Sequence, residues 1–148
     1  MTWVDFLQDS QAIRSIYCAD LPSLSDIDLH EVRLDRRGTS VFLRFDLADY
    51  PAPAPKKWIA RNANMVQLQL QFSDVGNLTL DGWGNYLPVA LEISSIPHSG
   101  YRVSCGKVPA LSMTARLISI FKMSAHYRID RAQPSGDTSI HRTLRSGY

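Results

Sequence analysis

Acidic side chains gather in one segment of the chain, where Asp26, Asp28, Glu31 and Asp35 follow one another closely. Paired carboxylates at a set separation across a cleft carry out glycoside hydrolysis. Acids on the edge strand of a sheet have a simpler use, because they discourage edge-to-edge aggregation. The second explanation needs no cleft, so we expect a solvated strand edge here. A hydrolase that uses this acidic strand is the weakest of three functional hypotheses.

The four histidines show no spacing that is typical of a metal site. They are His30, His98, His126 and His141. None is paired with another histidine, a cysteine or a glutamate as in HxxxH or HExxH. We therefore expect no metal and no cofactor.

Two further motifs resemble catalytic ones only in part. The turn formed by residues 82–84 has the sequence GWG, but it lacks the third glycine and the following helix of a dinucleotide-binding fingerprint. Ser104 has no GxSxG context, so a nucleophile elbow is not supported. With no candidate catalytic residue, we expect that the protein is not an enzyme.

The two cysteines, Cys18 and Cys105, are too few for a disulfide framework. Both stand among apolar neighbours, and a free cysteine behaves as a small hydrophobic residue. We expect two buried free thiols.

The composition is typical of a soluble globular protein. Of the 148 residues, 45% are hydrophobic and 20% are charged, which is enough apolar material for a core. We expect one domain over residues 1–130 and a polar, disordered tail over residues 131–148. No secretion signal is visible, and no apolar run reaches the roughly 18 residues of a membrane span. The expected location is the cytoplasm, without membrane contact.

Charge is distributed unevenly although the net charge is only +2, which is too small to indicate a nucleic-acid partner. Residues 1–100 hold 8 Lys and Arg against 12 Asp and Glu, whereas residues 101–148 hold 8 against 2. The front of the chain is therefore mildly acidic and the back is basic.

Apolar periodicity predicts a mainly β fold of the α+β type, an antiparallel sandwich-like body with an N-terminal helical segment. Trp3, Phe6 and Leu7 have helical spacing, and Ser10 can cap a second short helix. Alternating apolar positions then predict strands near residues 27–34, 41–47, 66–72, 78–80, 89–93 and 101–105. For residues 111–129 we favour one or two strands over a helix.

The first two strands carry the clearest local signals. Val41, Leu43, Phe45 and Leu47 alternate with mixed side chains, so one strand face is apolar. Residues 36–38 read RRG, a hairpin signal, and the apolar phase slips at residues 30–31, which indicates a β-bulge.

Two surface features could bind a partner. The outward positions Gln67, Gln69 and Gln71 are polar without charge, and such side chains can form hydrogen bonds without a large desolvation penalty. Large aromatic side chains also occur in or beside loops, where they often anchor interfaces. These aromatics are Tyr50, Trp58, Trp83 and Tyr86. The alternative for Trp58 and Trp83 is that they pack onto the core.

Several segments together resemble the immunity protein 50 family. They are WVDFL, PSLSDIDLHEVRLDRRG, VFLRFDL, the proline-rich step to KKW, and VQLQLQFSDVGNLTLDGW. The resemblance runs from Trp3 to about Arg128. It implies a bacterial cytoplasmic protein that binds and neutralises the cognate toxin of a polymorphic toxin system. The shared motifs are structural, and the family defines no catalytic residue to carry over.

Charge suggests where such a toxin would bind. Many toxins of this kind act on nucleic acids through basic clefts, which an acidic patch would complement. The candidate partner-binding residues are Asp26, Asp28, Glu31, Asp46, Asp49, Tyr50, Trp83 and Tyr86. The second functional hypothesis is a β-sandwich module that binds a carbohydrate or small ligand through Trp58, Trp83 and Tyr86.

Overall fold

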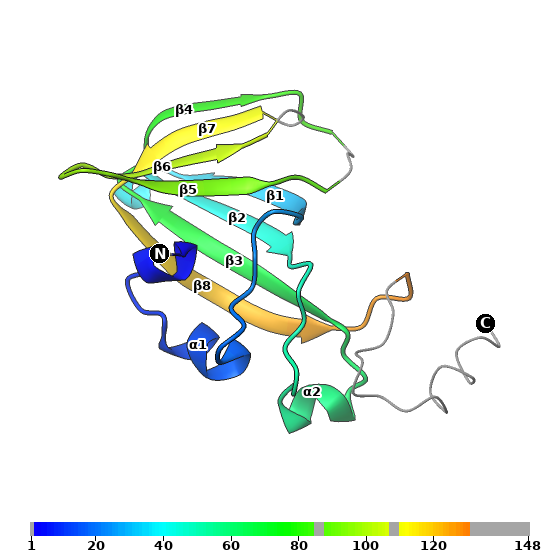
Figure 1. The fold of residues 1–148 in the computed structure, drawn as a ribbon. Coiled ribbons are helices and arrows are strands. Elements are labelled where there is room, and N and C mark those ends of the chain that lie inside the picture. Colours follow the sequence, from blue (N-terminus) through cyan, green and yellow to red (C-terminus); the bar gives the residue numbers. More distant parts are fainter. Residues whose placement is uncertain (1, 85–87, 107–109, 131–148) are drawn as a thin grey trace.

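Two four-stranded antiparallel sheets form the body of the protein in the computed structural model, which describes residues 2–84, 88–106 and 110–130 (Figure 1). In chain order the elements are η1 (Trp3–Phe6), α1 (Gln11–Tyr17), β1 (Asp28–Asp35), η2 (Arg37–Thr39), β2 (Ser40–Asp46), α2 (Lys56–Ala60), β3 (Met65–Ser73), β4 (Gly76–Asp81), β5 (Leu91–Ile96), β6 (Gly100–Cys105), β7 (Ala110–Ala115) and β8 (Leu117–His126). The predicted mainly β fold with an N-terminal helical segment is confirmed.

The strand order is β1-β2-β3-β8 in one sheet, here the first sheet, and β4-β7-β6-β5 in the other, the second sheet. The chain passes between the sheets twice, from β3 to β4 and from β7 to β8, and these passages lie side by side. The Arg116 amide donates a 3.0 Å hydrogen bond to the Ser73 carbonyl there. Gly100 lies against this corner with φ +94°, and a Cβ at its position would overlap the Ala115 carbonyl oxygen.

The opposite sides of the two sheets are also connected. Ile27, just before β1, forms an antiparallel bridge with Val89, just before β5. The Leu91 amide donates to the Leu24 carbonyl over 2.8 Å. The segments leading into β1 and β5 therefore link the sheets away from the corner, and the body is closed on both sides.

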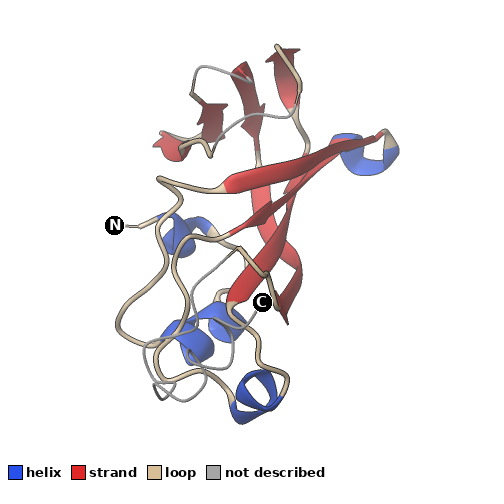
Figure 2. Ribbon diagram, turned by 90° about the vertical axis from the view of Figure 1, so that its right-hand side faces the viewer, coloured by secondary structure: helices blue, strands red, loops and turns tan. Residues whose placement is uncertain are grey.

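The core lies between the sheets and beneath the short helices. The residues of β2 and β3 that point toward the core are all buried, including Phe45 and Leu70, which are both 0% exposed. The second sheet contributes Val103 and Met113, and the helices contribute Ile13 and Trp58. Figure 2 shows η1, α1 and α2 away from one side of the first sheet, which leaves that side to face outward.

Local predictions about the strands are confirmed. β1 and β2 form an antiparallel hairpin around η2, and the register of β1 shifts between Leu29 and Glu31, which places a bulge at His30. Residues 110–126 form two strands that are separated at Arg116. Ser10 precedes α1, but its hydroxyl accepts from the Arg14 Nε atom instead of capping the helix. The predicted tail over residues 131–148 lies outside the described residues.

The prediction of two buried thiols is half wrong. Cys105 is 2% exposed, and burial raises the pKa of its thiol. Cys18 is exposed and ends α1 with φ 57°. None of the described helices has the length and apolar character needed to span a membrane.

Replacement of Phe45 or Leu70 by Ala should lower the free energy of unfolding by about 2–5 kcal/mol, because each leaves a cavity in the closed core. Chemical denaturation followed by circular dichroism measures the change. Ser95→Ala, at an exposed position of β5, is the control and should change it by less than about 0.5 kcal/mol. A loss below about 1 kcal/mol for either core variant would contradict the burial of that face.

The two thiols should differ in reactivity. In the native protein a thiol reagent such as Ellman's should modify Cys18 rapidly, whereas Cys105 should react only after denaturation, because it is buried with a raised pKa. Cys18→Ser should remove the fast phase. A fast phase that persists in this variant would show that Cys105 is accessible.

Candidate functional site on the open face of the first sheet

Strand register determines which side chains share the outer side of the first sheet. Residues 42, 44 and 46 of β2 alternate with its core residues, so they point away from the core. The pairing of β2 with β1 and β3 and of β3 with β8 brings their neighbours onto the same side. We name this side the open face. Its members include Asp28, His30, Glu31, Arg33, Asp35, Ser40, Phe42, Arg44, Asp46, Gln67, Gln69, Gln71, Ser119, Phe121, Lys122 and Ser124.

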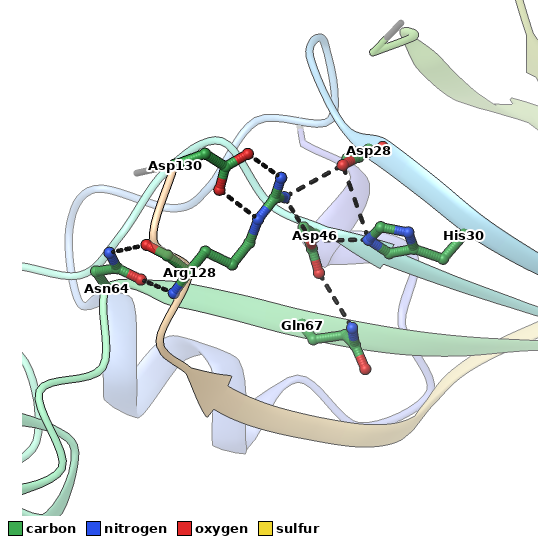
Figure 3. A network of polar contacts seen from close by, with 7 residues as sticks. All are labelled: Asp28, His30, Asp46, Asn64, Gln67, Arg128 and Asp130. Atoms are coloured by element: carbon green, nitrogen blue, oxygen red, sulfur yellow. Dashed lines mark hydrogen bonds and ion pairs between the residues drawn. The ribbon is translucent and has the colours of Figure 1, made fainter. Parts of the chain in front are cut away.

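One end of the open face holds a buried carboxylate, Asp46, which is 3% exposed (Figure 3). Its Oδ2 atom accepts a 2.8 Å hydrogen bond from Arg128 Nη1 and lies 2.8 Å from His30 Nε2. Its Oδ1 atom accepts from Gln67 Nε2 over 3.1 Å. A buried charge is costly unless it is paired and hydrogen-bonded, and these three contacts satisfy Asp46.

Arg128 is held by side chains from widely separated parts of the chain. Nη1 also donates to Asp28 Oδ2 over 3.2 Å, and Nε and Nη2 donate to the two oxygens of Asp130 over 3.1 and 2.7 Å. The hydrogen bonds to Asp130 are the main reason that the pKa of Arg128 is raised, with Asp28 and Asp46 adding to them.

The backbone of Arg128 is fixed as well. Its amide donates to Asn64 Oδ1 over 2.8 Å, and its carbonyl accepts from Asn64 Nδ2 over 2.9 Å. Asn64 is itself 3% exposed. The segment after β8 is therefore bound to the start of β3 in a single orientation.

The network also has the composition of a metal site. One oxygen or nitrogen atom each from Asp28, His30 and Asp46 lies within 4.8 Å of the others. Nη1 of Arg128 already occupies the cation position, at hydrogen-bond distance from both carboxylates. We therefore interpret these residues as an ion-pair network. Histidine spacing did not reveal the cluster, because its members come from two strands, but the outward phase of Asp28 and Asp46 on paired strands was a usable signal.

The middle of the open face is polar and mostly uncharged. Gln67, Gln69 and Gln71 of β3 are half-buried between β2 and β8. On the β1 side, Glu31 accepts a long hydrogen bond of 3.4 Å from Arg44 Nε, so these two charges offset each other.

The other end of the open face carries a stack of one arginine and two phenylalanines. The Cζ atom of Arg33 lies 4.0 Å from the ring centroid of Phe42 and 5.8 Å from that of Phe121. The two rings meet edge to face, with centroids 4.9 Å apart. Phe121 is 55% exposed, because a bulge in β8 pairs Lys122 with Gln69 and Ile120 with Leu70 and leaves Phe121 between them. Sequence reasoning missed this stack, since Phe121 only continued the apolar alternation.

The acidic residues predicted to bind a partner do not form one exposed patch. Asp28, Glu31 and Asp46 share the open face, but Asp46 is buried, so the expectation that it lies at the surface is wrong. Asp26 is exposed in the turn before β1. Asp49 lies against the N-terminal segment, where its Oδ2 atom accepts from the Ser23 amide over 2.8 Å.

The predicted aromatic residues are also separated. Tyr50 is half-buried, with its ring 6.2 Å from that of Trp58. Trp58 is 9% exposed and belongs to the core, whereas Trp83, beyond β4, is 47% exposed. Tyr86 lies outside the described residues. Partner binding by these residues remains a prediction.

A comparison with known protein families matches the part of the chain that forms the two sheets. Residues 9–126 match the family model described as immunity protein 50. This range begins just before α1 and ends with β8, so it includes every strand of both sheets. Neither the curated proteins nor the solved structures yield a significant match to the chain.

Arg128→Ala should lower the free energy of unfolding by about 3 kcal/mol, because Asp46 would remain buried without its counter-charge. Arg116→Ala is the matched control. Arg116 pairs with Asp74 over 3.5 Å, but both side chains are largely exposed, so its loss should be below about 1 kcal/mol. Equal denaturation midpoints for the two variants would show that the network does not stabilise the fold.

Proposed function

Because the chain belongs to the immunity protein 50 family, we propose that it binds a cognate protein toxin and neutralises it by stoichiometric occlusion. The family match over residues 9–126 is the observation that carries this proposal. The proposed setting is the bacterial cytoplasm, where the protein would protect the cell that makes the toxin. The proposed mechanism needs a rigid binding surface and no chemical step.

The open face is the surface of this protein that best fits such a role. The described helices place their buried residues Val4, Ile13, Tyr17 and Trp58 in the core, so the outer side of the first sheet remains available (Figure 2). It combines an exposed aromatic ring at Phe121 with the amides of the three glutamines. Aromatic anchors surrounded by polar groups that can form hydrogen bonds are typical of protein interfaces.

The sheet beneath this surface is suited to rigid recognition. β2 and β3 are central strands with fully buried inner faces, and the Asp46–Arg128 network fixes one end of the open face. A surface that is already ordered loses little conformational freedom on binding, which favours affinity.

The carbohydrate-binding alternative loses support from the structure. It depended on three aromatic side chains near one another. Trp58 is buried in the core and is therefore not available to such a ligand, whereas Trp83 is exposed. Tyr86 lies outside the described residues.

Neutralisation should be stoichiometric. The toxin to test is the C-terminal domain of the secreted protein encoded next to this gene. When its activity is titrated with purified protein, it should fall in proportion to the amount added and reach zero at one equivalent. Complete protection by a substoichiometric amount would overturn occlusion. Failure of the wild-type protein to bind this domain would overturn the proposed function.

A steric block identifies the surface that binds. Gln69→Trp places a large uncharged side chain at the centre of the open face and should weaken toxin binding by about tenfold or more. Ser95→Trp makes the same change at an exposed position of β5 in the second sheet and should leave the dissociation constant unchanged. The opposite pattern would assign binding to the second sheet.

A further inference from the structure

The open face has a charge balance that its sequence does not suggest. Each of its acids has an ion pair, because Asp28 and Asp46 bind Arg128, Glu31 binds Arg44 and Asp35 binds Arg37. Among the described residues, the charged members of the open face that lack an ion pair are Arg33 and Lys122. Both carry positive charge, so these two positions offer cations to a partner, whereas the end at Asp46 keeps more carboxylates than Arg128 can neutralise.

Arg33 is the more informative of the two. Its side chain is half-buried by the contact with Phe42, yet its guanidinium makes no hydrogen bond or ion pair with any described residue. The nearby carboxylate of Asp35 accepts from the backbone amide of Arg37, which is the main reason that the pKa of Asp35 is lowered, and the charges of Arg37 and Arg33 add to this effect. A guanidinium has five N–H donors and no acceptor, so Arg33 has donors left for a binding partner.

Stacking prepares this guanidinium for recognition. The guanidinium of Arg33 lies 4.0 Å from the Phe42 ring centroid and also near Phe121, and these contacts restrict the rotation of its side chain. Arg33 therefore loses less conformational freedom when it binds a partner. The planar fork of an arginine matches a carboxylate, which it can bind through two parallel hydrogen bonds. The exposed ring of Phe121 supplies an apolar contact directly beside it.

We propose that the open face docks onto an acidic surface of the toxin domain, with the stacked Arg33 guanidinium binding a carboxylate of that domain. This inference rests on the proposed function and specifies its partner surface. The charge of the proposed docking surface is opposite to the one expected from the sequence, which placed an acidic patch of this protein against a basic cleft of the toxin.

Other occupants fit the open face less well. A nucleic-acid backbone is held by many cations that neutralise successive phosphates, whereas this face offers two and also carries the carboxylates of Asp28, Glu31 and Asp46. A second copy that docked through its own open face would present the same two cations, and the described acids of that face are already paired. Charge complementarity therefore favours an acidic protein surface.

Substitution of Arg33 tests the proposal by titration calorimetry with the toxin domain encoded next to the gene. Arg33→Ala should weaken binding by about twentyfold or more, and Arg33→Lys, which retains the charge without the planar fork, should weaken it by about fivefold. Arg61→Ala, at an exposed arginine that follows α2, should bind as the wild type does. Circular dichroism and thermal unfolding of each variant establish that it is folded.

Charge exchange identifies the matching carboxylate. Arg33→Glu should abolish measurable binding, and one Asp→Lys or Glu→Lys substitution on the toxin should restore it to within about tenfold of the wild-type pair, because the two charges then attract again. The affinity of the wild-type pair should also fall as salt rises, and less steeply once Arg33 is replaced.

Each opposing result has a distinct meaning. If the wild type binds the toxin and Arg33→Ala and Arg33→Glu bind equally well, the proposal is wrong while the proposed function stands. If the wild type neither binds this toxin nor inhibits it, both this proposal and the proposed function are wrong. Arg33-dependent binding of a duplex DNA or RNA oligonucleotide would overturn the proposal in favour of a nucleic acid. Arg33-dependent dimerisation in sedimentation would overturn it in favour of a second copy.

Discussion

Strands β2 and β3 bury one face completely, and the rest of the structure follows from this constraint. Side chains of a strand alternate between two sides, so the neighbours of each residue that points into the core point to the opposite side. The apolar residues of both strands fill the space between the sheets. The intervening residues, among them Phe42, Asp46 and Gln69, must then share the outer side. The open face is the necessary counterpart of the core.

A buried ion pair decides the electrostatic character of that outer side. Asp46 and Asp28 look like free surface acids, but Arg128 pairs with both from a segment 82 and 100 positions away along the chain. Asn64 fixes the backbone of Arg128 through two further hydrogen bonds. This network joins the end of β8 to the starts of β1 and β3. It also leaves neither carboxylate unpaired on the surface on which a partner would act.

The same surface combines two properties that recognition requires. The strands that carry this surface are rigid, because their inner side chains are fully packed in the core. The groups on the surface are amides, one stacked arginine and one exposed aromatic ring. Rigid placement limits the entropy lost on binding, and the arginine and aromatic groups are those that most often carry interface energy. The proposed binding of a toxin requires both properties.

The sequence by itself determined the strands, the β1–β2 hairpin, the bulge at His30 and the apolar side of β2 that holds Phe45. These features depend on local alternation and turn residues, which any short window of the chain contains. It also supported the family resemblance, which the match over residues 9–126 confirms.

The tertiary structure alone decided which surface residues are free to act. Arg128 pairs with Asp46 because β8 lies beside β3 in one register, and Phe121 turns outward because of a bulge in that pairing. Trp58 is buried and Trp83 is exposed, although both are tryptophans in or beside loops, and Cys18 faces solvent despite apolar neighbours. Periodicity predicts the two sides of a strand. Which charges and rings meet on one side depends on long-range contacts between strands, and the alternation within a single strand does not predict these contacts.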